Sequence, residues 1–150
     1  MLGFTQVELV VVVVVAGILA LATVPRFSGD SGFEARAFRD GVVASLRYAQ
    51  KSAVAARRTT CATFSGAPAR VDFQISNNNG AANCTLGAPL IGPDNRALQV
   101  TAANNVTFVV LPADVVFDGA GRPLGASAIS ISGLDAGLVI AVEAETGYVH

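Results

Sequence analysis

Catalytic chemistry needs a nucleophile or an acid–base pair, and this chain offers few residues of either kind. Its single histidine is His150, and no serine or cysteine has a basic partner nearby in the sequence. Asp114 and Asp118 come nearest to a carboxylate pair, and a turn-capping role is the simpler explanation for Asp118. No phosphate-binding loop or metal-ligand pattern is present. The sequence therefore predicts no enzyme, no catalytic residue, no bound metal and no cofactor.

One carboxylate stands out by its position in the sequence. Glu8 lies just before a run from Leu9 to Val24, in which every residue is apolar except Gly17 and Thr23. With the residues from Phe4 onward, the segment reaches about 20 residues, or about 30 Å as a helix, which matches the apolar core of a bilayer. An ionised carboxylate in such surroundings costs several kcal/mol unless it has a partner.

Three plainer explanations compete for this segment. A cleaved secretory signal needs a basic region before the apolar run and a small-residue cleavage site, whereas nothing basic precedes the run and Thr23-Val24-Pro25 is a poor cleavage sequence. A buried helix of a soluble protein keeps a polar stripe, whereas the valines from Val10 to Val15 cover every helix face. A plain membrane anchor remains, but it leaves Glu8 without a partner.

The N-terminal segment combines Gly3-Phe4-Thr5, Glu8, the apolar run and Pro25-Arg26-Phe27. This combination resembles the N-terminal signal of type IV pilins and type II secretion pseudopilins. The resemblance implies that a prepilin peptidase cuts between Gly3 and Phe4, that the new amine of Phe4 is N-methylated, and that Glu8 becomes the fifth residue of the mature chain. It also implies a partner for Glu8, the terminal amine of a neighbouring subunit in a helical filament. Such a pair would fix the stagger between subunits, because an unpaired buried charge is strongly penalised.

Two positions depart from the family pattern. The leader usually ends in Lys or Arg before the glycine, whereas only Met1 and Leu2 precede Gly3. No basic residue then holds this end in the cytoplasm, so we expect the start codon to lie upstream. Gln6 occupies a position that is usually apolar, a small cost that a location among lipid headgroups would absorb.

A second helical pattern follows the apolar segment. Pro25 lacks an N–H group and crowds the preceding turn, which predicts a kink there. The glycine- and serine-rich residues 28–32 favour a looser backbone. From Phe33 to Arg58 the sequence then has the period of an amphipathic helix. Its apolar side comprises Phe38, Val42, Leu46, Ala49 and Ala53, and its charged side Arg36, Asp40, Arg47, Lys51 and Arg58.

The remainder of the chain has the pattern of short β-strands. Five runs are β-branched or alternating: 69–75, 106–110, 115–117, 128–132 and 138–142. Turn residues separate them at 77–80, 118–121, 132–133 and 145–147. A long N-terminal helix followed by such strands predicts an α+β fold in which the helix packs on an antiparallel sheet. We expect a leader remnant (1–3), a transmembrane and filament-core helix (4–27), an amphipathic helix (28–58) and a periplasmic β-rich head (59–150).

Three stretches extend the resemblance over nearly the whole chain: LRYAQKSAVAARRTTC (46–61), VVFDGAGRP (115–123) and GLVIAVEAETGYVH (137–150). They resemble the minor pseudopilins of the GspH/FimT type and the minor pilins of mannose-sensitive haemagglutinin (MSHA) pili. The resemblance implies a pilin-like fold and a structural subunit of a type IV pilus or a type II secretion pseudopilus. It places the subunit first in the bacterial inner membrane, with a single pass. Its implied partners are other pilin subunits, the prepilin peptidase and the inner-membrane assembly platform.

The two cysteines, Cys61 and Cys84, match no zinc or redox motif, because neither has another cysteine or a histidine near it in the sequence. With the apolar segment embedded, the chain after Pro25 lies outside the inner membrane, where disulfides form and persist. We therefore expect one bridge, joining the end of the amphipathic helix to the asparagine-rich loop and adding about 3 kcal/mol of stability. Two buried free thiols are the alternative.

DNA binding is the alternative function, because some pilins of the GspH/FimT type act in DNA uptake by competence pili. Seven of the 10 Lys and Arg residues lie at or before Arg58, and seven of the 11 Asp and Glu residues lie after it. The head therefore carries a net charge of −4, against +3 for the first part, and should repel phosphate. The DNA-uptake branch has a second arginine two residues after the one that Arg122 resembles, where this chain has Leu124. We expect the cluster of Arg57 and Arg58 to meet acidic faces of neighbouring subunits or to be a solvated helix end.

Overall fold

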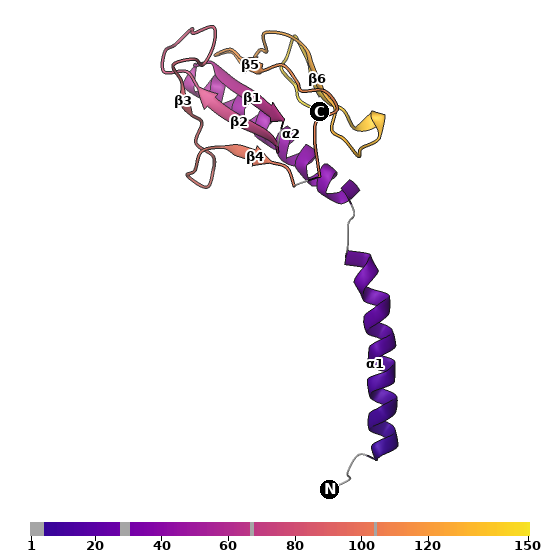
Figure 1. Ribbon diagram of the computed structural model, residues 1–150. Helices are drawn as coiled ribbons and strands as arrows, with labels where there is room; N and C mark the ends of the chain where they lie inside the picture. Colours follow the sequence, from indigo (N-terminus) through magenta and orange to yellow (C-terminus); the bar gives the residue numbers. More distant parts are fainter. Residues whose placement is uncertain (1–4, 28–30, 67, 104) are drawn as a thin grey trace. The chain divides into compact units, whose positions relative to one another are not determined.

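The computed structural model describes residues 5–27, 31–66, 68–103 and 105–150. The chain divides into two units, Met1–Asp30 and Ser31–His150. The first contains helix α1 (Gln6–Phe27), and the second contains helix α2 (Ser31–Ala56) and the β-strands (Figure 1). The predicted α+β class, with helices and an antiparallel sheet, is confirmed.

Helix α1 consists almost entirely of the apolar run. Its first turn is closed by the carbonyl oxygen of Thr5, which accepts hydrogen bonds from the N–H groups of Glu8 (3.1 Å) and Leu9 (3.2 Å). The helix continues through Pro25 and ends at Phe27, so the proline does not end the helix, and the kink stays a prediction. Within the described residues, no helix combines the length and the apolar character that crossing a membrane requires.

Helix α2 buries the apolar side that its sequence predicts. The buried side chains recur every three or four residues and belong to Ala35, Phe38, Val42, Val43, Leu46, Ala49 and Ala53. The predicted charged side is exposed, as expected for Arg36, Asp40, Arg47, Lys51 and Arg58. The helix therefore forms because one face of a 3.6-residue repeat is removed from water while the other stays solvated.

The C-terminal end of α2 is closed by a Schellman motif, in which the residue after the cap adopts a left-handed conformation. The N–H group of Arg58 donates to the carbonyl oxygen of Ala53 (3.1 Å), and that of Arg57 donates to Val54 (3.3 Å). Arg57 has a φ of 52°. Glycine takes this conformation freely, whereas a residue with a side chain pays about 1–2 kcal/mol.

Helix α2 packs on an antiparallel sheet whose strands are β1 (Thr60–Gly66), β2 (Ala69–Ile75), β3 (Ala88–Pro89), β4 (Gln99–Thr101) and β5 (Val115–Phe117). β1 pairs with β2 on one side and with β5 on the other, and β2 also pairs with β3 and β4. Ala62 lies opposite Phe73 on β2 and opposite Val115 on β5. Because side chains alternate along a strand, these three residues share one face, and all three are buried.

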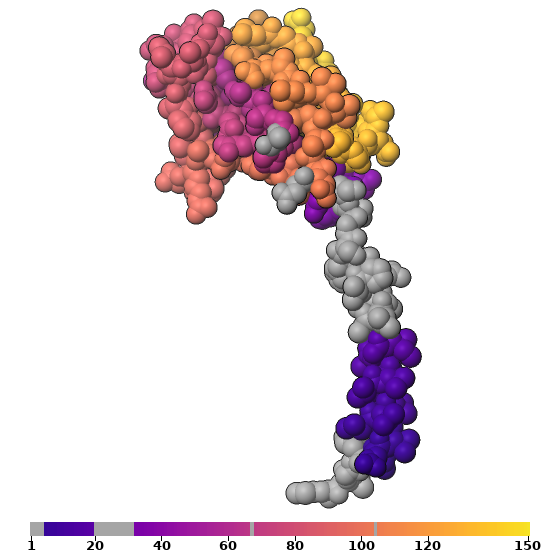
Figure 2. Space-filling model, viewed as in Figure 1, coloured from indigo at the N-terminus to yellow at the C-terminus, as the bar shows by residue number. Residues whose placement is uncertain are grey.

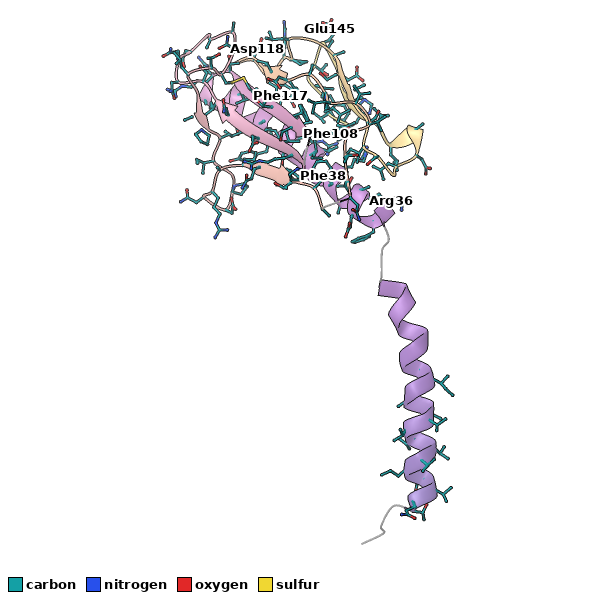
Figure 3. All side chains as sticks on the ribbon, viewed as in Figure 1. Arg36, Phe38, Phe108, Phe117, Asp118 and Glu145 are labelled. Atoms are coloured by element: carbon teal, nitrogen blue, oxygen red, sulfur yellow. A yellow bond between two sulfur atoms is a disulfide. The ribbon has the colours of Figure 1, made fainter. Side chains whose placement is uncertain are left out.

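The hydrophobic core lies between α2 and this face of the sheet. Leu46, Phe73 and Phe117 are among its largest fully buried side chains. Phe108, from a later loop, extends the core: its ring centroid lies 5.7 Å from that of Phe38 and 5.6 Å from that of Phe64 (Figure 3). Unit 2 thus has a core that is made of its own helix, sheet and loop residues.

The C-terminal part of the chain adds a second, two-stranded sheet. Strand β6 (Ser127–Ile129) pairs antiparallel with β7 (Ile140–Val142), which follows the short helix η1 (Ala136–Leu138). The last residues return along β7 through two backbone hydrogen bonds between Ala141 and His150 (2.8 and 3.0 Å). Figure 2 shows this part in yellow beside the orange segment that precedes it.

One side chain of α2 joins two turns, one between β5 and β6 and the other after β7. The amide nitrogen of Gln50 donates to the carbonyl oxygens of Gly121 (3.1 Å) and Thr146 (2.9 Å). We call this pair of bonds the Gln50 clasp. Asp118 and Glu145, which lie in the two joined turns, are found at the same end of unit 2 (Figure 3). The clasp therefore fixes the closing turn of the chain onto the helix.

The predicted strands are only partly confirmed. The runs 69–75 and 115–117 are β2 and β5, and the runs 128–132 and 138–142 overlap β6 and β7. The prediction of a strand at 106–110 is wrong. In this run only Phe108 forms a β-bridge, with Ile131, and Val109 is 64% exposed. The alternating pattern of the run suits a strand. Backbone hydrogen bonds join Val109 to Ser130 (3.0 Å) and Ser132 to Thr107 (2.8 Å), but the pairing is limited to this single bridge. Strand β1 was not predicted, because its sequence TCATFSG has few β-branched residues.

Candidate assembly site

Glu8, the carboxylate singled out in the sequence, lies in the first turn of α1. Its N–H group is 3.4 Å from the hydroxyl oxygen of Thr5, which places Thr5 at the N-cap and Glu8 at the third helical position. A Thr and a Glu at this spacing are the residues of a capping box. A carboxylate at the N-terminal turn gains about 0.3–1 kcal/mol from the helix dipole. This local gain is smaller than the cost of leaving a charge unpaired in an apolar environment.

Thr5 caps the helix that carries Glu8, a role that was not predicted. The pattern Thr-x-x-Glu before an apolar run was the available signal. The helix therefore begins at a defined point, and this point sets the position of Glu8 one turn from the helix start.

The described side chains that follow Glu8 form an apolar surface without a polar stripe. The large ones between Val7 and Leu19 are from 50% exposed (Val15) to 73% exposed (Val7). Glu8, itself exposed, is the only ionisable residue between Thr5 and Leu19. Continuous apolar surface of this kind marks a contact with lipid or with other proteins.

The predicted N-terminal site also includes Gly3, Phe4 and Pro25. Gly3 and Phe4, at the expected cleavage point, lie outside the described residues. Pro25 belongs to α1 by its backbone, and its side chain is outside the described part. The structure therefore brings together Thr5 and Glu8 at this end, and the cleavage point stays a prediction.

The predicted bridge between Cys61 and Cys84 is confirmed. The two Cα atoms are 6.0 Å apart, and both side chains are buried. One detail of the prediction was wrong: Cys61 is the second residue of β1 and does not belong to the helix, which ends at Ala56. Cys61 points to the sheet face opposite the core, because Thr60 and Ala62 on either side of it face α2. The bridge thus fastens the loop between β2 and β3 over the back of the sheet.

Reducing this bridge should lower the free energy of unfolding by about 3 kcal/mol, because the freed loop regains conformational entropy in the unfolded chain. For a protein of this size, the melting temperature should fall by about 10 °C. Differential scanning calorimetry of the full chain in detergent, with and without a thiol reductant, measures the change. A Cys61→Ser/Cys84→Ser variant is the control and should not respond to reductant. Free alkylation of both cysteines in the native, unreduced protein would contradict the assignment.

The basic cluster of Arg57 and Arg58 lies at the C-terminal end of α2, at the Schellman motif. Both residues are exposed, and neither takes part in the ion pairs seen among the described residues. The Nε atom of Arg58 donates to the side-chain oxygen of Asn79 at 3.3 Å. The cluster therefore borders the asparagine-rich loop.

The remaining polar candidates have structural partners. The carboxylate of Asp118 accepts hydrogen bonds from the N–H groups of Ala120 (2.9 Å) and Arg122 (2.8 Å), which confirms its predicted role as a turn cap. His150 Nε2 lies 2.9 Å from a carboxylate oxygen of Glu143 on the surface. In the part of the chain that the structure describes, no group of three or more His, Cys, Asp or Glu side chains could hold a metal ion.

Comparisons with protein-family models, with curated proteins and with solved structures find no significant match to this chain.

Proposed function

We propose that this chain is a structural subunit, a minor pilin or pseudopilin, which assembles through α1 into a type IV pilus or a type II secretion pseudopilus. The observation that carries the proposal is the pairing of two features on one helix. The described side chains of α1 after Glu8 are exposed and apolar on every face, and a single carboxylate lies in the first turn of the helix. Such a helix can be buried only by lipid or by similar helices, and its one charge then needs one partner.

Before assembly, the subunit would be held in the bacterial inner membrane with unit 2 in the periplasm. Support for the membrane-spanning role comes from the sequence of residues 4–27, which extends beyond the described side chains at both ends. The disulfide between Cys61 and Cys84 is compatible with this location, because disulfides persist in the periplasm.

In the filament, the apolar faces of neighbouring α1 helices would cover one another, and Glu8 of one subunit would meet the methylated terminal amine of the next. Each subunit then uses two different surfaces, the carboxylate and the amine. A heterologous contact of this kind produces an open helical array and not a closed ring when the rotation between subunits does not close. The partners required are further copies or related subunits, a prepilin peptidase and an assembly platform in the inner membrane.

Processing gives the direct test of this proposal. Co-expression with a prepilin peptidase should yield a chain that begins at Phe4 and carries one methyl group on its amine. Gly3→Val should abolish the cut, because a branched side chain is too large for a peptidase pocket that accepts glycine. Intact-mass spectrometry of the purified chain distinguishes the two products.

Gly17→Val is the matched control, since it makes the same exchange inside α1, where an added side chain meets no described atom within 4 Å. This variant should be cut normally. A mature wild-type chain that still begins at Met1, or that begins after Pro25, would rule out the pilin proposal.

A further inference from the structure

The loop between β2 and β3 contains an asparagine–glycine pair in an exposed turn. Asn79 and Gly80 are both exposed. Gly80 has a φ of +72°, and no atom lies within 4 Å of the position that its Cβ would occupy. Because glycine has no side chain and no other atom occupies its Cβ position, nothing at that position crowds the backbone nitrogen of Gly80.

Two side-chain anchors hold this turn on either side of the pair. The hydroxyl of Ser76, which is buried, donates to the carbonyl oxygen of Asn78 at 3.0 Å. The hydroxyl of Thr59 donates to the carbonyl oxygen of Ala81. The anchors leave Asn79 and Gly80 at the tip of the turn and keep them beside the end of α2.

We propose that Asn79 is a site of spontaneous deamidation. A solvent base removes the proton from the nitrogen of Gly80, which attacks the side-chain amide carbon of Asn79. The amide nitrogen takes up a proton from water or from that base and leaves as ammonia. Water then opens the resulting succinimide ring at either carbonyl, which gives aspartate or isoaspartate at position 79. The reaction needs only water and a base from the solvent, and no other reactant.

Arg58 lies where it can assist this reaction. Its Nε–H group is 3.3 Å from the amide oxygen of Asn79, and this oxygen takes up negative charge when the nitrogen adds to the carbon. A cationic donor at that oxygen stabilises the addition step. Because Arg58 is exposed, solvent weakens the effect, and we expect a rate contribution of about two- to fivefold.

The product changes the charge of the basic cluster. A carboxylate at position 79 replaces a neutral amide beside Arg58, so the net charge of the cluster and its loop falls by one. In the isoaspartate form, the backbone also gains a methylene group between the anchors at Asn78 and Ala81. Deamidation would thus alter both the charge and the shape of the surface at the end of α2.

Peptide mapping of the purified full chain, incubated at mildly alkaline pH, tests the proposal. The internal control is Asn77, which lies in the same loop, precedes a larger residue, and donates its amide to the carbonyl oxygen of Leu86. Asn79 should convert about ten times faster than Asn77, equivalent to about 1.4 kcal/mol in activation free energy. Conversion of Asn79 no faster than that of Asn77 would overturn the proposal.

Two variants test the roles of Asn79 and Arg58 separately. Asn79→Gln should remove the fast conversion from this loop, because the longer side chain closes a less favourable ring. Arg58→Gln should slow the conversion of Asn79 about two- to fivefold and leave that of Asn77 unchanged. An unchanged rate in Arg58→Gln would eliminate the assisting role of the arginine, and fast conversion in Asn79→Gln would place the site elsewhere.

Discussion

Glu8→Gln should be missing from sheared filaments while it accumulates in the inner membrane. Insertion and peptidase cutting depend on the apolar run and on Gly3, so both should be normal. Assembly should fail, because the neighbour's terminal amine is then buried without a counter-charge, a loss of about 3–5 kcal/mol at each contact. Immunoblots of membrane and sheared fractions measure the distribution.

The capping geometry makes this variant a sharp test. The hydroxyl of Thr5 accepts from the backbone of Glu8 and so can cap the helix whatever the side chain at position 8. Gln also preserves the residues of a capping box. The substitution removes the negative charge. It thereby also removes the favourable interaction of the carboxylate with the helix dipole, about 0.3–1 kcal/mol. Gln6→Ala, a neutral change two residues before Glu8 in the same helical turn, is the control and should be incorporated. Normal incorporation of Glu8→Gln would show that the charge does not set the stagger.

Gly147→Ala should lower the free energy of unfolding of the chain by about 3 kcal/mol. Gly147 has a φ of +68°, which costs a residue with a side chain about 1–2 kcal/mol. An added Cβ would also collide with the carbonyl oxygen of Gly121 and lie 2.6 Å from the amide nitrogen of Gln50. The Gln50 clasp would have to open, at a further cost of about 1 kcal/mol for each hydrogen bond lost.

Chemical denaturation of the full chain in detergent, monitored by far-ultraviolet circular dichroism, measures this difference. Gly137→Ala is the matched control, because Gly137 has no positive φ and its Cβ position has no neighbour within 4 Å. That variant should unfold within about 0.5 kcal/mol of the wild type. Equal stability of the two variants would mean that the closing turn does not depend on the clasp.

Periodicity predicted the parts of this fold in which one face of an element is buried. The stripe from Phe38 to Ala53 and the strand 69–75 alternate in the way that burial requires, and both are found where the sequence places them. The run 106–110 has an equally good strand pattern, yet it is not a strand. Strand formation depends on a partner that is distant in the sequence, and the local pattern carries no information about this partner.

The candidate site also combines contacts between residues close in the sequence, which can be predicted, with contacts between distant residues, which cannot. The spacing of Thr5 and Glu8 is local and could be read as a cap, and the turn at Asp118 was predicted from its residues. The Gln50 clasp joins residues that are 71 and 96 positions apart, and the contact of Arg58 with Asn79 depends on how the loop is folded back. These contacts follow from the tertiary arrangement and leave no mark in the sequence pattern.

The bridge between Cys61 and Cys84 also has a mechanical consequence. When a chain is pulled from its ends, the segment between two bridged cysteines carries no tension, because the covalent link transmits the force across it. The sequence separation of 23 residues would otherwise contribute about 80 Å of extended length. The paired strands β1 and β2 lie almost wholly inside this segment. Under tension, unit 2 can therefore lose other parts of its structure while most of this hairpin remains mechanically shielded, as it would in a subunit of the proposed filament.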